Sequence, residues 1–298
     1  MSPKYSIIIP HKNIVNLLLR CINSVPRRGD TEIIVIDDNS NTMSVVALQE
    51  TSRVRPDINI IFTKEGRGAG YARNIGINHA QGEWLIFADA DDYFTEDAFD
   101  FFLSQSASNS DIIYTRMTGW NDVTNNYCDR GETYSRMVHE YLSGTIPEKA
   151  MRYMFHSPCC KMIKKELVDK YHLRFSEVMT GNDALFSVMV GHYAHKIEAF
   201  ERTTYVATIS GNNISRKYDF ESVLSRYIED LKINRFLRHH GQWCWQLPIL
   251  ETIKQFGRRR KIQLLWLAVT YGQPLFVDHY TKARYERLFH TNDPFENL

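Results

Sequence analysis

Three carboxylates crowd into four consecutive positions of this sequence, Asp89, Asp91 and Asp92. They follow a short apolar run, 84–88, whose β-forming residues predict a strand buried on both faces. Like charges at this spacing repel one another, and a divalent cation held by oxygen ligands would offset the repulsion. The segment therefore predicts a Mg²⁺ or Mn²⁺ site that holds a diphosphate. A turn followed by a helix capped at Thr95 is the simpler alternative, and it accounts for only one of the carboxylates.

A fourth carboxylate of chemical interest is Asp183. It follows Gly181 and Asn182 and precedes an apolar stretch that predicts a helix to about residue 191. A carboxylate at a helix amino terminus is stabilised by the helix dipole, so Asp183 fits a helix cap as well as a catalytic base. The spacing alone does not separate these two roles.

The elements that would position these residues alternate between strand and helix. Apolar runs at 5–9, 32–36 and 58–62 predict buried strands, with helical periodicity between them. This order implies a parallel sheet with right-handed crossovers. Pro10 is expected to end the first strand, because proline cannot continue a central ladder. The carboxyl ends of such strands meet at one edge, so the polar residues after the first two strands are expected near Asp89.

A glycine-rich stretch, 66–70, follows the third predicted strand. It does not match the dinucleotide-binding fingerprint, because Tyr71 occupies the third glycine position and the first strand does not precede it. A flexible turn and a backbone that passes close to a ligand both remain open. The helix predicted over 69–80 carries Arg73, which fits a contact with a phosphate or a base as well as a surface ion pair.

Two later segments are candidates for substrate contacts. Residues 116–144 are rich in Asn, Thr, Gly and Tyr, and we expect them to be irregular and to face a specific substrate. Trp120 in this segment offers a flat apolar face with a polar edge, which suits a sugar ring. The polar loop 210–217 ends in two cations, which fits anion binding or simply an exposed loop.

Four consecutive cations, 258–261, directly precede the apolar segment 262–269. Such a combination docks on anionic bilayers, and a core helix with a solvated charged end is the more ordinary interpretation. No run has the length of a transmembrane helix, and the first residues lack the features of a signal peptide. Five irregularly spaced cysteines favour reduced thiols. We therefore expect a cytoplasmic protein, with peripheral contact to the inner face of the membrane through 258–271 as one hypothesis.

The length and composition of the chain are those of an ordinary globular protein. The chain has 298 residues, 43% of them hydrophobic and 24% charged, which fits one large domain or a domain with an appendage. Its formal net charge of +1 supplies no global field that would attract nucleic acid, so we expect no nucleic-acid partner.

Five pieces of the sequence resemble the family-2 glycosyltransferases of the GT-A fold. They occur in the family's order and at family-like separations over about the first two hundred residues, and they are 6–13, 34–40, 68–76, 82–92 and 182–186. The resemblance implies an α/β fold whose Rossmann-like, mostly parallel central sheet is flanked by helices. We expect this domain to span 1–215 and a helical C-terminal extension to span 216–298.

The resemblance also implies roles for single residues. Asp91 is expected to bind the metal, and Asp183 is expected to be the general base. The residues expected to bind the nucleotide sugar are Pro10, Asn13, Asp38, Arg73, Asp89, Ala90, Ser215 and Arg216. Trp120 and Asn182 are expected on the acceptor side. Lys12 and Val15 depart from the family, since many members have an aromatic residue and a glutamate there.

The expected reaction is single-displacement, inverting transfer of a sugar from a nucleoside diphosphate, by default UDP, to a hydroxyl group of a glycan or lipid-linked acceptor. A Mn²⁺ or Mg²⁺ cofactor would stabilise the leaving group, and one carboxylate would remove the hydroxyl proton. Two other functions stay open from the residues alone. One is an Asp-dependent phosphotransferase or phosphatase that uses Asp89, and the other is a catalytically silent module that binds nucleotide sugars.

Overall fold

A nine-stranded mixed sheet organises the first part of the chain in the computed structural model, which describes residues 3–210 and 219–274. The spatial order of the strands is β3-β2-β1-β4-β8-β6-β9-β5, and β7 pairs with β6 beside this path. The strands are β1 (Tyr5–His11), β2 (Thr31–Asp38), β3 (Ile58–Thr63), β4 (Trp84–Phe87), β5 (Tyr93–Phe94), β6 (Ile112–Asn121), β7 (Asn126–Cys128), β8 (Lys161–Lys164) and β9 (Ile197–Ile209).

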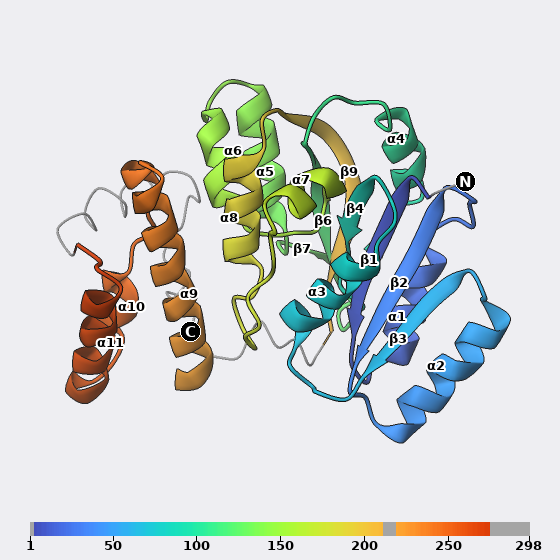
Figure 1. The fold of residues 1–298 in the computed structure, drawn as a ribbon, viewed down its shortest axis with the longest axis horizontal. Helices are drawn as coiled ribbons and strands as arrows, with labels where there is room; N and C mark the ends of the chain where they lie inside the picture. The colour runs from blue at the N-terminus through green and yellow to red at the C-terminus, as the bar shows by residue number, and fades with distance from the viewer. Residues whose placement is uncertain (1–2, 211–218, 275–298) are drawn as a thin grey trace. The chain divides into compact units, whose positions relative to one another are not determined.

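Helices cover both faces of this sheet (Figure 1). Those of the first part are α1 (Val15–Asn23), α2 (Thr42–Val54), α3 (Ala69–His79), α4 (Ala98–Ser104), α5 (Glu132–Leu142), α6 (Glu148–Met154), α7 (Lys165–Lys170) and α8 (Ala184–Tyr193). The chain adds β2 and β3 on one side of β1 and then returns to place β4 on the other. The crossover helix α3 therefore lies on the sheet face opposite to α1 (Figure 1).

The predicted parallel arrangement is confirmed for the four strands β3, β2, β1 and β4. The expected end of β1 at Pro10 is wrong, because the strand continues to His11 while paired with β2. The ladder between β1 and β4 already ends at Ile8 and Phe87. Pro10 thus lies where β1 has lost one of its two neighbours, and the missing N–H is tolerated there.

The second half of the sheet is mixed. β8 is antiparallel to both β4 and β6, whereas β6 and β9 run parallel over almost their whole length. β9 is one strand of 13 residues, and β5 joins its edge in the antiparallel direction. The sheet therefore continues well beyond β4, the strand that leads into the acidic cluster.

The expectation that residues 116–144 are irregular is wrong. They form the second half of β6, the short strand β7 and the helix α5. Their composition hid this structure because β7 is largely exposed and the buried residues of β6 alternate with partly exposed ones from Arg116 onward, so no apolar run marks these strands. Ser135 of α5 donates to the carbonyl of Met117 in β6 and accepts a hydrogen bond from the Met117 N–H at 3.0 Å. Asn125, with a left-handed φ of 53°, lies in the turn between β6 and β7.

Helix α3 holds the segment that leads into α8. The Asn74 amide donates to the carbonyl of Phe175 at 3.0 Å and accepts from its N–H at 2.8 Å. Gly70 lies so close to this segment that a Cβ atom on it would stand 2.0 Å from the carbonyl oxygen of Ser176 and 3.0 Å from the Cβ of Asn182. The glycine-rich stretch thus serves a close approach of backbone to backbone, which only glycine permits.

The chain divides into two units, Met1–Ile214 and Ser215–Leu298. The boundary expected at residue 215 lies outside the described residues. In the second unit the described elements are α9 (Phe220–His239), the 3₁₀ turn η2 (Trp243–Trp245), α10 (Leu250–Lys254) and α11 (Arg258–Thr270). They share a small core of buried side chains, which are Tyr227, Leu231, Ile249, Ile253, Leu264 and Ala268.

The approach at Gly70 yields a stability prediction. Gly70→Ala should lower the free energy of unfolding by about 1–3 kcal/mol, the usual cost of overpacking, despite the better helix propensity of alanine. This corresponds to a fall in melting temperature of about 2–4 °C per kcal/mol for a domain of this size, measurable by calorimetry. Gly29→Ala is the matched control, since nothing lies within 4 Å of a Cβ atom there. Equal melting temperatures of the two variants would contradict the close approach.

Candidate active site

The acidic turn after β4 is fixed by β9 of the same sheet. The Asp92 carboxylate is 2% exposed and accepts hydrogen bonds from the Thr208 N–H at 2.7 Å and the Tyr205 hydroxyl at 2.9 Å. The Tyr205 hydroxyl also accepts from the N–H of Asp89 at 2.8 Å. Asp92 is therefore engaged within the protein on both of its oxygens, and it anchors the turn that presents Asp89 and Asp91.

The three carboxylates lie close enough to share a cation. One oxygen atom from each of Asp89, Asp91 and Asp92 lies within 4.8 Å of the others. Burial and the charge of Asp89 raise the pKa of the Asp91 carboxyl, and burial and the charges of Asp91 and Asp89 raise that of Asp92 well above its usual range. No side chain among the described residues donates a hydrogen bond to the Asp91 carboxylate. The charges of Arg130 and Arg20 offset only part of the rise in the pKa of Asp91, so the crowded carboxylate oxygens fit a hard divalent cation held by Asp91 and Asp89.

A buried guanidinium links the acidic turn to the candidate base. Arg73 of α3 is 4% exposed and donates to the carboxylate of Asp89 at 2.5 Å and to the side-chain oxygen of Asn182 at 2.8 Å. Its charged group also lies 5.2 Å from the ring centre of Phe175. Although burial opposes it, the charges of Asp89 and Asp183 raise the pKa of Arg73. Segments separated by about a hundred residues of sequence thus meet at one cation.

Asp183 directly precedes α8. Its side chain makes no capping hydrogen bond with that helix, so the structure does not support the cap that the sequence left open. Burial raises the pKa of its carboxyl, against the opposing effect of Arg73. A carboxyl group in this environment takes up a proton more readily than one in water, as a general base must.

Three residues expected around the nucleoside lie at the ends of β1 and β2. The Asp38 carboxylate accepts hydrogen bonds from the backbone N–H groups of Arg67 at 3.1 Å and Gly68 at 2.8 Å. Asn13 has a left-handed φ of 60°, and its side-chain oxygen accepts from the N–H of Asn41 at 2.8 Å. Pro10 is buried in β1. Asp38 and Asn13 therefore hold the loops at this edge in place, whether or not they also bind a ligand.

A buried histidine, which sequence reasoning missed, reinforces the same edge. Nδ1 of His11 donates to Asp37 at 2.8 Å, and its Nε2 accepts the N–H of Ile14 at 3.1 Å. Burial opposes it, but hydrogen bonds from His11 and Ser40 lower the pKa of the Asp37 carboxyl. The loop after β1 is thereby tied to the end of β2.

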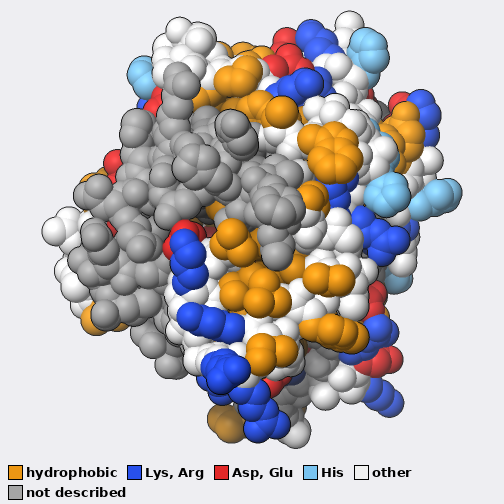
Figure 2. Space-filling view, turned by 90° about the vertical axis from the view of Figure 1, so that its left-hand side faces the viewer, with side chains coloured by type: hydrophobic (Ala, Val, Ile, Leu, Met, Phe, Trp, Pro, Cys, Tyr) orange, Lys and Arg blue, Asp and Glu red, His pale blue; other side chains and the backbone are white. Residues whose placement is uncertain are grey.

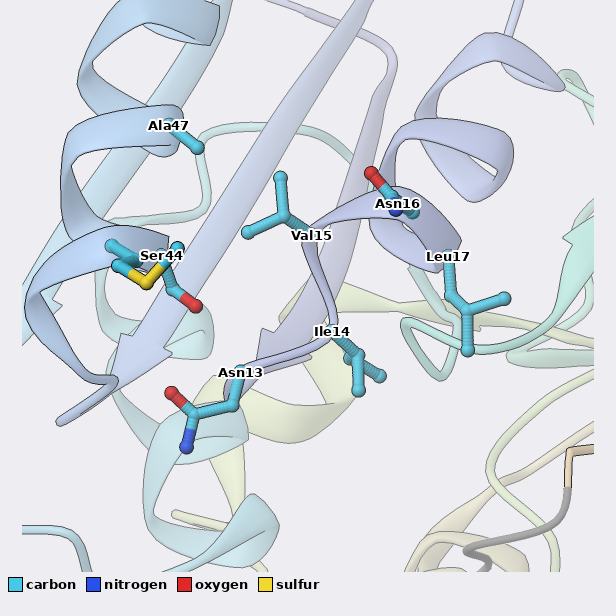
Figure 3. Close-up of a pocket in the computed structure, with 8 residues that line it drawn as sticks. Asn13, Ile14, Val15, Asn16, Leu17, Ser44 and Ala47 are labelled. Carbon is cyan, nitrogen blue, oxygen red and sulfur yellow. The ribbon is translucent and has the colours of Figure 1, made fainter.

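An open groove of about 320 Å³ lies between the first turns of α1 and α2 (Figure 3). Val15 projects toward Ser44 and Ala47, and Asn13 lies at one end of the groove (Figure 3). Its lining residues are Asn13, Ile14, Val15, Asn16, Leu17, Met43, Ser44 and Ala47. None of the candidate metal or base carboxylates lines it, so the groove is separate from the acidic cluster.

The remaining expected residues are dispersed. Ala90 is buried in the acidic turn. Trp120 lies in β6 with its ring centre 5.3 Å from that of Tyr127 in β7. Ser215 and Arg216 lie outside the described residues. Asn182 is 8% exposed and holds Arg73, so its amide has a structural role whether or not it contacts an acceptor.

Arg20 is a second residue that sequence reasoning missed. From α1 it donates to the backbone carbonyl of Asp91 at 2.5 Å, to the Asp122 carboxylate at 2.8 Å and to the Thr208 hydroxyl at 3.2 Å. It thereby joins the acidic turn to the ends of β6 and β9. A lone arginine on an amphipathic helix carries no local signal of this role, because its three acceptors are distant in sequence.

In sequence, this chain is similar to known glycosyltransferases. The family model described as glycosyl transferase family 2 matches residues 6–172. EpsH of Bacillus subtilis, a protein named as a glycosyltransferase, is 22% identical over 308 residues, which cover 95% of this chain and 87% of EpsH. The poly(ribitol-phosphate) beta-N-acetylglucosaminyltransferase TarS of Staphylococcus aureus is 26% identical over 244 residues, which cover 74% of this chain but only 39% of TarS.

Two solved structures share the fold. The crystal structure of S. aureus TarS 1-349 in complex with UDP-GlcNAc has a TM-score of 0.59 at 18% identity and covers 99% of this chain and 94% of that chain. The mannosyltransferase PcManGT from Pyrobaculum calidifontis, in complex with GDP-Man and Mn²⁺, has a TM-score of 0.56 at 16% identity and covers 98% and 89%. At these identities the likeness concerns the fold alone.

The contacts of Arg20 predict a role in positioning the candidate metal ligand Asp91. Arg20→Lys keeps the charge but loses the planar fork that reaches three acceptors. We expect the affinity for Mn²⁺ in the presence of UDP, measured by titration calorimetry, to fall by about tenfold or more, as for other residues that orient metal ligands. Arg116→Lys, in an exposed ion pair with Glu201, is the matched control and should leave the affinity unchanged. Wild-type affinity in Arg20→Lys would exclude the role.

Proposed function

The chain belongs to glycosyl transferase family 2 and is a glycosyltransferase of the GT-A fold, and on this premise we propose that it moves a sugar from a nucleoside-diphosphate donor to a hydroxyl group of a glycan or lipid-linked acceptor. The observation that carries the proposal is the junction at Arg73. There the acidic turn after β4 and the segment of Asp183 meet through two hydrogen bonds. A donor site and a base for the acceptor must be adjacent in any direct transfer between them.

We propose UDP as the nucleotide of the donor. TarS, which shares this fold, was solved with UDP-GlcNAc, whereas PcManGT was solved with GDP-Man, so the fold accommodates both nucleotides. The proposed donor-binding residues are Pro10, Asn13, Asp38, Arg73, Asp89, Ala90, Ser215 and Arg216. Their support is the position of the described members at the carboxyl edge of β1, β2 and β4, or on α3 beside it, where α/β sheets bind their ligands.

Asp91, assisted by Asp89, is proposed to hold Mn²⁺ or Mg²⁺. When bound, such a cation acts as a Lewis acid that neutralises charge on the departing diphosphate. The chain itself contributes the rigid turn. Asp92, Tyr205 and Arg20 fix the backbone of this turn, so that the two ligand carboxylates are already oriented before a ligand arrives.

Asp183 is proposed to accept the proton of the acceptor hydroxyl as its oxygen attacks the anomeric carbon. The bond from that carbon to the diphosphate breaks in the same step, which inverts the configuration. Trp120 and Asn182 are proposed to lie on the acceptor side. We also propose that the protein is located in the cytoplasm. TarS acts on poly(ribitol-phosphate), as its name states, which supports a polymeric hydroxyl acceptor. Of the two other functions, the phosphotransferase is disfavoured because the family model that matches this chain is one of glycosyl transferases.

The metal proposal predicts the behaviour of Asp91→Asn. This variant should lose the Mn²⁺-dependent part of UDP binding while its melting temperature without ligand stays close to that of the wild type. In the wild type, UDP with Mn²⁺ at about a hundred times its dissociation constant should stabilise the fold by about 2.7 kcal/mol, seen as a rise in melting temperature. The same rise in Asp91→Asn would refute the assignment.

The base proposal predicts a loss of turnover without a loss of binding. Asp183→Asn removes the group that accepts the proton, so the rate of transfer should fall by about a hundredfold or more. It keeps the shape of the side chain, so UDP affinity and melting temperature should stay the same. Because burial raises the pKa of this carboxyl, the wild-type rate should decline on acidification at a higher pH than for an ordinary aspartate. The measurements are kcat, UDP affinity and the pH profile of kcat. A fully active Asp183→Asn would assign the base to another residue.

A further inference from the structure

Helix α11 presents an apolar stripe to solvent on the side away from its own core. Leu264 and Ala268 are fully buried among the core side chains of the second unit. Ile262, Trp266 and Val269 are 61%, 64% and 67% exposed, at spacings of four and three residues that align them on one face. The expected core helix is therefore present, but its outer face is apolar as well.

Cations occupy the amino-terminal turn of the same helix. Arg258, Arg259 and Lys261 have no carboxylate partner among the described residues, whereas Arg260 lies over the ring of Phe220 at 4.2 Å. The helix has no acidic residue in its first turn and no side-chain cap at Gly257. In the space-filling view, hydrophobic side chains gather in the middle of the face shown, and Lys and Arg side chains border them (Figure 2).

This arrangement is unfavourable for the helix itself. Positive charges at a helix amino terminus oppose the helix dipole, and among the described residues no side chain caps the first turn of α11 at Gly257. A large tryptophan side chain that stays exposed to water also adds no buried apolar surface to stabilise the fold. Such local conflicts are expected where a surface meets a ligand of complementary chemistry. The chemistry that complements the cations and the apolar stripe of α11 is an anion next to an apolar phase.

We infer that the outer face of α11 docks on the surface of a phospholipid bilayer that carries anionic headgroups. Headgroup phosphates would accept from Arg258, Arg259 and the free N–H groups of the first turn, and Ile262, Trp266 and Val269 would enter the boundary between headgroups and acyl chains. Charge favours the bilayer over a second copy of this chain, because α11 contains no acidic residue and the same face of another copy would therefore offer these cations no carboxylate. Among the described helices none is long and apolar enough to cross a bilayer. The inference deepens the proposed function by naming a lipid surface as partner, but its support lies wholly in the second unit.

The test is flotation of the full chain with vesicles of phosphatidylcholine alone or mixed with phosphatidylglycerol. We expect binding to the anionic vesicles only, weakening with salt. Arg258→Gln with Arg259→Gln should reduce vesicle affinity by about thirtyfold, from two cations near the surface. Trp266→Ser should reduce it by about tenfold or more. The matched controls are Trp243→Ser, which removes a tryptophan that is 50% exposed in the same unit, and Arg53→Gln with Lys149→Gln, which removes two exposed charges from the first unit.

Each contrary outcome overturns the inference. No flotation of the wild type, equal binding to neutral vesicles, or equal losses in the controls would exclude the α11 face. A Trp266 side chain already shielded from a soluble quencher in the free protein would mean that residues 275–298 or a second copy cover it, and gel filtration separates these two. UDP binding with Mn²⁺ is measured on every variant. It should be unchanged, so failure of the docking face and failure of the proposed transfer are distinguished.

Discussion

A buried cation between two segments is the constraint on which the site depends. The guanidinium of Arg73 is almost entirely removed from water, and a charge in that position is tolerated only while it is paired. Its acceptors are Asp89 and Asn182, one from each functional segment. Loss of the Asp89 carboxylate would leave an uncompensated buried charge, a cost of about 3–5 kcal/mol in comparable cases, whereas loss of Asn182 would remove a neutral hydrogen-bond acceptor. The acidic turn, α3 and the segment before α8 are therefore held in one arrangement, in which α3 acts as the common support.

Much of this architecture could be predicted from local sequence, and the reason is physical. β1, β2 and β4 are buried on both faces, so their apolar runs are nearly unbroken and their polar ends are conspicuous. Asp89 follows β4 closely, Arg73 lies on the helix α3 that precedes β4, and Asp183 directly precedes the apolar helix α8. Residues 116–144 failed the same analysis because most of their side chains are partly or fully exposed. β7 has no buried residue, and burial alternates along β6 from Arg116 onward, so no apolar run marks either strand.

The residues that the sequence did not reveal act across long separations. Arg20 reaches Thr208, and Tyr205 holds Asp92, so neither Arg20 nor Tyr205 has its partner within reach of a local pattern. The net charge of +1 is equally uninformative, since it averages an acidic cluster at a sheet edge with a cationic turn in a different unit. In both cases the chemistry depends on which residues lie together in space, and the composition of the chain does not record this.

The hold of β9 on the acidic turn has a consequence for synthesis of the chain on the ribosome. Asp92 is buried against the N–H of Thr208 and the hydroxyl of Tyr205, which emerge 116 and 113 residues after it. A nascent chain that has completed only β1 to β4 has the parallel ladder but no donors for this carboxylate, so the turn stays hydrated and open. The contacts that hold the candidate site therefore cannot be completed until the strand that ends at Ile209 adds to the sheet. A chain truncated before that strand would contain every candidate catalytic carboxylate and still lack a formed metal site.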